Sequence, residues 1–186
     1  PGMTLDMLTE GALALSAEEH LKMQSYADKI VATMNRSIEV RVTSPSGTDL
    51  LFNTRGREFW SDTKIDWHRL RWINLPTGEV AVAPVEDSLE GKLICDKAVG
   101  GIGVTRDLVQ IFARKGKVQK IDCADRSLRT RVIKALNTDG WASIVAEFAI
   151  GVNSKAQFTT HFLETEKIKG SAQVAFGHNL DFPGGK

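Results

Sequence analysis

The sequence predicts an α+β domain with a mixed, largely antiparallel sheet and flanking helices. Apolar residues recur at helical spacing in a few segments, they alternate with polar residues in several others, and turns containing Gly or Pro join the strand-like segments. Helices separated by groups of hairpin-linked strands are typical of this class. No repeat or linker interrupts the pattern, so residues 1–186 are expected to form one domain.

The first segments are helical, and strands follow them. Ser16 and Glu19 form a capping-box pair, after which apolar residues recur on one helical face as far as Met34. Residues 4–15 are expected to form a shorter helix ahead of this one. From residue 38 the apolar period changes to two, and the turn at 45–47 precedes a second apolar segment at 50–52. This pattern predicts a hairpin.

Three of the four tryptophans, Trp60, Trp67 and Trp72, lie within residues 57–73. One interpretation places them in loops and edge strands that pack on the core. The other makes them an aromatic surface for a ligand or partner. The sequence leaves both open.

The second half contains further strands and two helices. Strands are predicted at 79–83, 92–95, 108–113, 118–123 and 172–176, with a hairpin turn at Lys115 and Gly116. Asp125 is expected to cap a helix whose apolar face includes Leu136, and a short helix is expected at 162–168. The glycines at 100–103 indicate a turn, because position 106, where the dinucleotide fingerprint needs a third glycine, is Arg106.

Charge, hydropathy and cysteine content indicate which partners and which cellular compartment to expect. A net charge of +1 with scattered Lys and Arg argues against nucleic acid as a partner, and no apolar run is long enough to span a membrane. Cys95 and Cys123 lie in separate apolar stretches and form no CxxC pair. This placement is typical of buried thiols, and it indicates a reducing compartment. A cytoplasmic protein is expected.

Two carboxylates stand out because each lies in an apolar setting. Glu79 begins the segment 79–83, and Glu147 interrupts the apolar run 143–150. An ionised carboxylate that is buried without a partner costs several kcal/mol. Each should therefore be paired, bound to a metal, or located on the solvent face of a strand.

Residues around these glutamates resemble a known family. Residues 74–80 read NLPTGEV, followed by Ala-Pro at 83–84 and Glu-Gly at 90–91. This run resembles the N-L-P-x-G-E-V motif of aminopeptidase T-like leucyl aminopeptidases. The resemblance continues, in the same order, at 147–153 (EFAIGVN), 164–167 (ETEK) and 175–179 (AFGHN), and upstream at 44–50 (SPSGTDL). It implies the fold of that family's C-terminal domain.

The family holds a pair of divalent metals that activate water for peptide hydrolysis. By resemblance, Glu79 and Glu147 match metal-binding glutamates. The family's metal-binding His is Gln173 here, its ligand Tyr has no counterpart because Tyr26 lies in the early helix, and its late H-x-D pair would follow Lys186. The family's N-terminal domain is not among the 186 residues. His178 is the candidate substitute ligand, which would complete a three-residue site with the two glutamates.

These departures favour a non-catalytic peptide-binding or substrate-presenting protein with no cofactor, built on a degenerate metallopeptidase fold. Its cleft is expected to bind an extended peptide or protein segment, and homodimers are expected because family members often pair. The alternative is an active hydrolase using zinc, manganese or iron, with substitute ligands or a site completed by another subunit. A structural subunit with an unused cleft is the third hypothesis. The predicted cleft residues are Asn74, Pro76, Glu79, Glu147, Asn153, Gln173 and Asn179.

Overall fold

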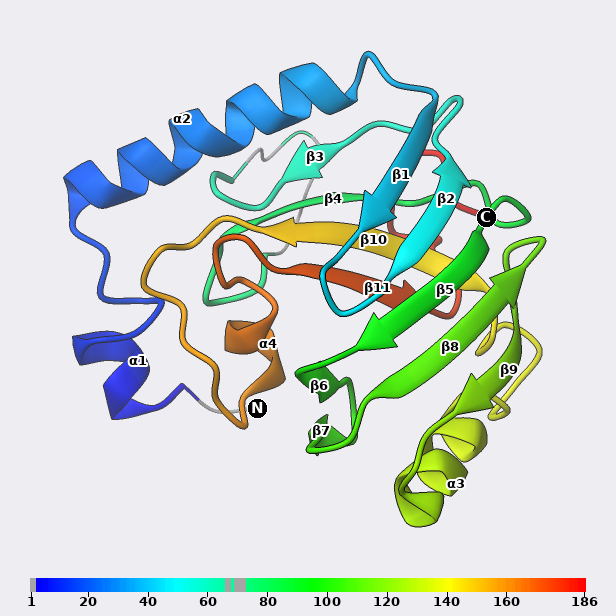
Figure 1. The fold of residues 1–186 in the computed structure, drawn as a ribbon. Coiled ribbons are helices and arrows are strands. Elements are labelled where there is room, and N and C mark those ends of the chain that lie inside the picture. The colour runs from blue at the N-terminus through cyan, green and yellow to red at the C-terminus, as the bar shows by residue number, and fades with distance from the viewer. Residues whose placement is uncertain (1–2, 66–67, 69–72) are drawn as a thin grey trace. The chain divides into compact units, whose positions relative to one another are not determined.

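A computed structural model describes residues 3–65, 68 and 73–186 (Figure 1). The chain groups into two compact units. The first comprises residues 1–36, 59–81 and 149–173, and the second comprises 37–58, 82–148 and 174–186. The expectation of a single domain stays a prediction.

The first unit begins with two helices. Helix α1 is Leu5–Thr9, and α2 is Ala17–Met34. The predicted capping box is confirmed, because the Ser16 hydroxyl accepts the Glu19 N–H at 3.2 Å and the Glu19 carboxylate accepts the Ser16 N–H at 2.8 Å. The helix predicted over residues 4–15 is shorter than expected. It stops before Gly11, where an added Cβ would lie 2.6 Å from the Glu164 carboxylate.

The four-stranded sheet has the order β11-β10-β4-β3, with β3 at Trp60–Ser61, β4 at Glu79–Val82, β10 at Val145–Gly151 and β11 at Ala172–Phe176. All four residues of β4 are buried. Helix α4, at Phe162–Thr165, lies in the connection between β10 and β11 and is shorter than the predicted 162–168. The two other tryptophans of the 57–73 region, Trp67 and Trp72, lie outside the described residues, so both interpretations of that region stay predictions.

The second unit contains a five-stranded antiparallel sheet, in the order β1-β2-β5-β8-β9. Its strands are β1 (Glu39–Thr43), β2 (Asp49–Asn53), β5 (Glu90–Cys95), β8 (Val109–Arg114) and β9 (Lys117–Asp122). Both predicted hairpins, β1–β2 and β8–β9, are confirmed. The glycine-rich turn at 100–103 is also confirmed, and it joins the short strands β6 (Ala98–Val99) and β7 (Gly103–Val104).

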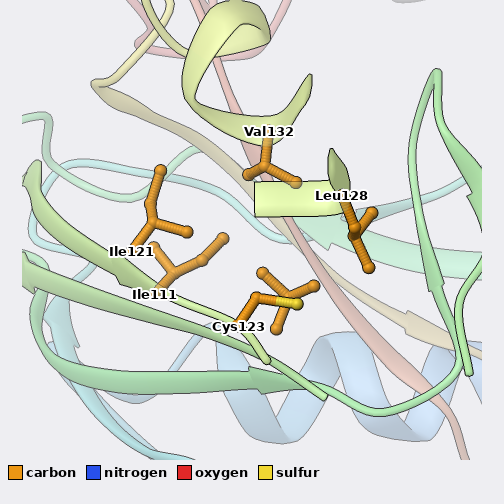
Figure 2. Close-up of a cluster of buried hydrophobic side chains, with 6 residues drawn as sticks. Ile111, Ile121, Cys123, Leu128 and Val132 are labelled. Carbon is orange, nitrogen blue, oxygen red and sulfur yellow. The ribbon is translucent and has the colours of Figure 1, made fainter. Parts of the chain in front are cut away.

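One hydrophobic cluster of the second unit lies between the β8–β9 hairpin and helix α3 (Arg126–Ala135). Leu128 and Val132 project from the helix toward Ile111, Ile121 and Cys123 (Figure 2). The Asp125 carboxylate caps α3 as predicted, by accepting the N–H groups of Ser127 and Leu128. Both cysteines are free thiols. In the described part of the chain, no helix is long and apolar enough to cross a membrane.

Candidate functional site

The candidate site lies in the first unit, where β4 begins. Gly78 precedes Glu79 with a φ of +134°, and an added Cβ there would lie 2.5 Å from the Cβ of Asn153. Only glycine fits this close approach without strain. The backbone N–H groups of Gly78 and Glu79 both donate to Asp62 Oδ1, at 2.8 and 2.7 Å. The side chain of Asp62, directly after β3, therefore fixes the entry into β4.

A fully buried lysine meets these carboxylates. Lys167 follows α4, and its exposed fraction is 0%. Its ammonium group donates to Glu79 Oε1 and, at 2.7 Å, to Glu166 Oε1. The Lys167 Nζ also lies 3.7 Å from Asp62 Oδ2. One cation therefore serves three carboxylates that come from three separate segments of the chain.

The second oxygen of Glu79 is also occupied. The side-chain amide of Gln173, in β11, donates to Glu79 Oε2 at 3.0 Å. The carboxylate of Glu79, which is 5% exposed, thus has an intramolecular partner at each oxygen. This arrangement satisfies a buried carboxylate in the way that its burial demands.

The three carboxylates together carry more charge than the single ammonium group, and all four groups are buried. The pKa values of three of them, Asp62, Glu166 and Lys167, are therefore raised. Burial raises the pKa of Asp62 from an ordinary 3.8 to about 6, although Lys167 opposes the change. Burial likewise raises the pKa of Glu166. Burial alone would lower the pKa of Lys167, but the charges of Glu79, Asp62 and Glu166 outweigh it and raise that pKa. Asp62 Oδ2 is buried and has no hydrogen-bond donor among the described residues, as fits a carboxylate that readily takes up a proton.

The pKa of Asp62 predicts a pH dependence of stability. Between pH 3.8 and about 6 the folded state binds more protons at this residue than the unfolded state does, so stability falls as pH rises through this range. Compared with a pH below 3.8, the free energy of unfolding at pH 7 is lower by about 3 kcal/mol, since each unit of pKa difference corresponds to about 1.4 kcal/mol. We expect Asp62→Asn to remove most of this fall, as measured by urea unfolding at several pH values.

Asp49→Asn provides the control for that prediction. The hydrogen bond from Arg41 lowers the pKa of Asp49, so this carboxylate contributes with the opposite sign, and Asp49 is exposed. An Asp62→Asn variant with the same decline between pH 4 and 7 as the parent chain would contradict the assignment to Asp62.

Other predicted cleft residues of the first unit are buried or half-buried, and Asn153 also makes hydrogen bonds within the unit. Pro76 is buried, with a cis Leu75–Pro76 peptide bond before it, and Asn74 is half-buried. The buried Asn153 side chain donates to the carbonyls of Ala12 and Thr77 at 3.0 and 2.9 Å. Its oxygen accepts the backbone N–H groups of residues 155 and 156. Asn153 therefore holds three segments of the unit together, and its role in a cleft stays a prediction.

The remaining predicted residues belong to the second unit. Asn179 is buried and donates to Glu86 Oε1 at 3.1 Å, while Glu147 is half-buried in β10 and His178 is exposed. A metal site formed by Glu79, Glu147 and His178 stays a prediction. Among residues 3–65, 68 and 73–186, no three His, Cys, Asp or Glu side chains form a group that could hold a metal ion.

Asp62 is a member of the site that the sequence does not point to, and Glu166 and Lys167 appear there only as part of the motif at 164–167. Asp62 lies in the tryptophan-containing region, where it follows the two-residue strand β3 and shows no periodic pattern. The available signal was the apolar setting of Glu79, which required a partner. The sequence did not identify that partner as Lys167, 88 residues away.

The first unit also has an open, largely apolar hollow of about 460 Å³. It is formed by the segment after α1, the first turn of α2, and the loop before β4. Three polar side chains, Ser16, His20 and Thr77, lie among its apolar residues, and the lining consists of Ala12, Leu13, Leu15, Ser16, Ala17, His20, Leu21 and Thr77. Concave apolar surfaces with a few polar groups are typical of ligand sites.

Comparison with known proteins identifies the fold. The family model for thermophilic metalloproteases (M29) matches residues 16–183. The 2,5-dihydroxypyridine dioxygenase of Pseudomonas putida KT2440 superposes with a TM-score of 0.78 at 19% identity, covering 94% of this chain and 53% of that one. Wild-type AmpT from Thermus thermophilus superposes with a TM-score of 0.65 at 22% identity, covering 88% and 43%. The chain spans about half the length of these two solved proteins. No curated protein matches it.

Proposed function

Because the chain belongs to the M29 family of thermophilic metalloproteases, we propose that it is a non-catalytic peptide-binding or substrate-presenting protein built on that family's fold. One observation carries the proposal: the Glu79 carboxylate, which matches a metal-binding glutamate by resemblance, is neutralised by Lys167 and hydrogen-bonded by Gln173. An internal cation thus takes the role that a metal ion would have.

The donor set around Glu79 does not fit a divalent metal. An ion bound to Glu79 would lie against the Lys167 ammonium group, and two cations in a buried site repel each other strongly. Gln173 presents an amide nitrogen that already donates to Glu79, and an amide is a poor ligand for zinc-like ions compared with imidazole. Peptide hydrolysis through a metal pair at this position is therefore not part of the proposal.

The hollow beside α2 is the proposed peptide site. Its lining offers an apolar surface for one side chain of a peptide, together with the hydroxyl groups of Ser16 and Thr77. Burying a Leu or Phe side chain there would contribute about 1.5 to 3 kcal/mol. The loop before β4 supplies Thr77, so peptide binding and the Glu79 site share one structural segment.

Calorimetry with a library of short peptides tests the proposal. We expect peptides with a large apolar residue to bind, with the same affinity before and after EDTA treatment, because no metal takes part. Ala17→Trp fills the hollow and should weaken binding about tenfold or more, in line with the loss of one buried side chain. Ala32→Trp is the matched control, because Ala32 is exposed on the same helix outside the hollow.

The alternative is an active hydrolase, in which a metal ion would displace the Lys167 ammonium group as the counter-charge of Asp62, Glu79 and Glu166. Peptide cleavage that EDTA abolishes, and that Glu147→Gln also abolishes, would establish this alternative and refute the proposal.

A further inference from the structure

Charge is distributed unevenly along the chain, and one segment of the second unit is strongly basic. Residues 114–134 contain eight Lys or Arg residues and two Asp residues, a net charge of +6 in a chain whose total is +1. All eight basic residues are exposed. The segment comprises the end of β8, strand β9 and helix α3. It gives the second unit a positively charged surface that the whole-chain charge conceals.

Helix α3 carries a basic face that includes one aliphatic side chain. The two buried residues of this helix pack against the β8–β9 hairpin, which leaves its other sides in solvent (Figure 2). Arg126, Arg129 and Ile133 follow one another at intervals of three and four residues, so they are neighbours along one exposed side of the helix. Ile133 is 39% exposed, and Lys134 is exposed next to it in the sequence. These four residues are called the basic face of α3.

The basic face of α3 has no counter-charge of its own. Within the described residues, no carboxylate forms an ion pair with any of its three basic side chains. The carboxylates nearest in the sequence have other partners. Asp125 accepts two backbone N–H groups at the start of α3, and Asp122 Oδ2 lies 3.7 Å from the Nζ of Lys120. A partner with carboxylates would therefore find these cations available.

We propose that the basic face of α3 binds an acidic segment of a partner protein, in which an aliphatic side chain lies among carboxylates. The carboxylates pair with Arg126 and Arg129, since a guanidinium group binds a carboxylate through two N–H groups. The aliphatic side chain of the partner covers Ile133. Opposite charges speed the encounter, and the apolar contact removes area from water. This surface is separate from the proposed peptide site beside α2, whose lining belongs to the first unit.

Other classes of partner fit the basic face of α3 less well. An anionic membrane would need an apolar helix face to insert, and the apolar face of α3 is buried against the hairpin. The phosphates of a nucleic acid would use the Arg and Lys side chains alone, and its bases would need an aromatic side chain for stacking. Residues 126–135 contain no aromatic residue. Arginines around an apolar side chain are typical of protein interfaces.

Fluorescence anisotropy with labelled probes tests the proposal. The first probe is a synthetic peptide of about ten residues in which leucines alternate with pairs of glutamates. The second has glycine in place of each leucine, and the third is an oligo-dT of similar charge. The parent chain should bind the leucine peptide, more weakly as NaCl rises from about 0.05 to 0.5 M, because salt screens the charges. The glycine peptide should bind about fivefold more weakly, because it cannot cover Ile133.

Three variants show whether the basic face of α3 is the site. Arg129→Glu should raise the dissociation constants of both peptides about fivefold or more. Arg55→Glu is the matched control and should leave them nearly unchanged, because Arg55 is an exposed residue after β2, which β5 and β8 separate from β9. Ile133→Ser should remove the advantage of the leucine peptide over the glycine peptide without weakening the glycine peptide. Circular dichroism verifies that each variant folds, since all three positions are exposed.

Three results would overturn the proposal. One is a parent chain that does not bind the leucine peptide at low salt. Another is equal binding of the leucine and glycine peptides, which would show attraction by charge alone, with no part for Ile133. The third is tighter binding of oligo-dT than of the leucine peptide at the same salt concentration, which would assign the basic face of α3 to nucleic acid.

Discussion

Replacing Lys167 by methionine is expected to lower the free energy of unfolding at pH 7 by about 3 to 5 kcal/mol, the cost of removing one partner from a buried ion pair. Methionine fills a similar volume but leaves Glu79, Asp62 and Glu166 without their shared cation. Chemical denaturation measures the loss directly. At pH 4.5 the loss should be smaller, because raised pKa values allow Asp62 and Glu166 to be neutral there.

Two further variants show whether this loss has an electrostatic cause. Lys169→Met is the matched control, because Lys169 is exposed two residues away and its ammonium group lies over the ring of Tyr26 instead of among carboxylates, so it should cost about 1 kcal/mol or less. Adding Glu79→Gln to Lys167→Met should restore part of the stability by removing an uncompensated buried charge. A Lys167→Met chain as stable as the parent would contradict the assigned role of the ammonium group.

Replacing Asn153 by alanine is expected to cost about 3 kcal/mol or more, because each lost hydrogen bond contributes about 1 kcal/mol and the abandoned groups are buried. Four backbone groups lose their partner: the carbonyls of Ala12 and Thr77, and the N–H groups of Lys155 and Ala156. Thermal and urea unfolding measure the change.

The same variant separates a structural role for Asn153 from a role in peptide binding. Asn137→Ala is the control, since Asn137 is exposed and donates to a single carbonyl, and it should cost about 0.5 to 1 kcal/mol. An Asn153→Ala chain that keeps its stability but no longer binds peptide would show that Asn153 acts in the cleft and not as an anchor.

Much of the fold was predictable because it depends on local signals. The Ser16–Glu19 capping box, the Asp125 cap and the Lys115–Gly116 turn each involve residues within a few positions of one another, and all three are present. The end of α1 was not predictable from local signals, because just beyond it the Ala12 N–H donates to the Glu164 carboxylate, 152 positions later in the chain. The order of the strands likewise depends on pairings between distant segments.

The candidate site was predictable only in part for the same reason. Glu79 stood out as a carboxylate among apolar residues, and of the alternatives left open the structure shows a buried carboxylate with side-chain partners. Whether Glu79 binds a metal, faces solvent or pairs with an internal cation depends on which distant residues the fold brings next to it. Lys167 follows a short helix and lies in a polar stretch of sequence, so nothing local distinguishes it from a solvated lysine.

The most direct test of an internal cation at Glu79 is a titration of the 186-residue chain with zinc and with manganese. Isothermal calorimetry measures the binding, and elemental analysis after dialysis measures the metal that is retained. We expect no stoichiometric binding to the parent chain, because the Lys167 ammonium group already neutralises the Glu79 carboxylate. A stoichiometric pair of tightly bound ions, lost on Glu79→Gln, would contradict it.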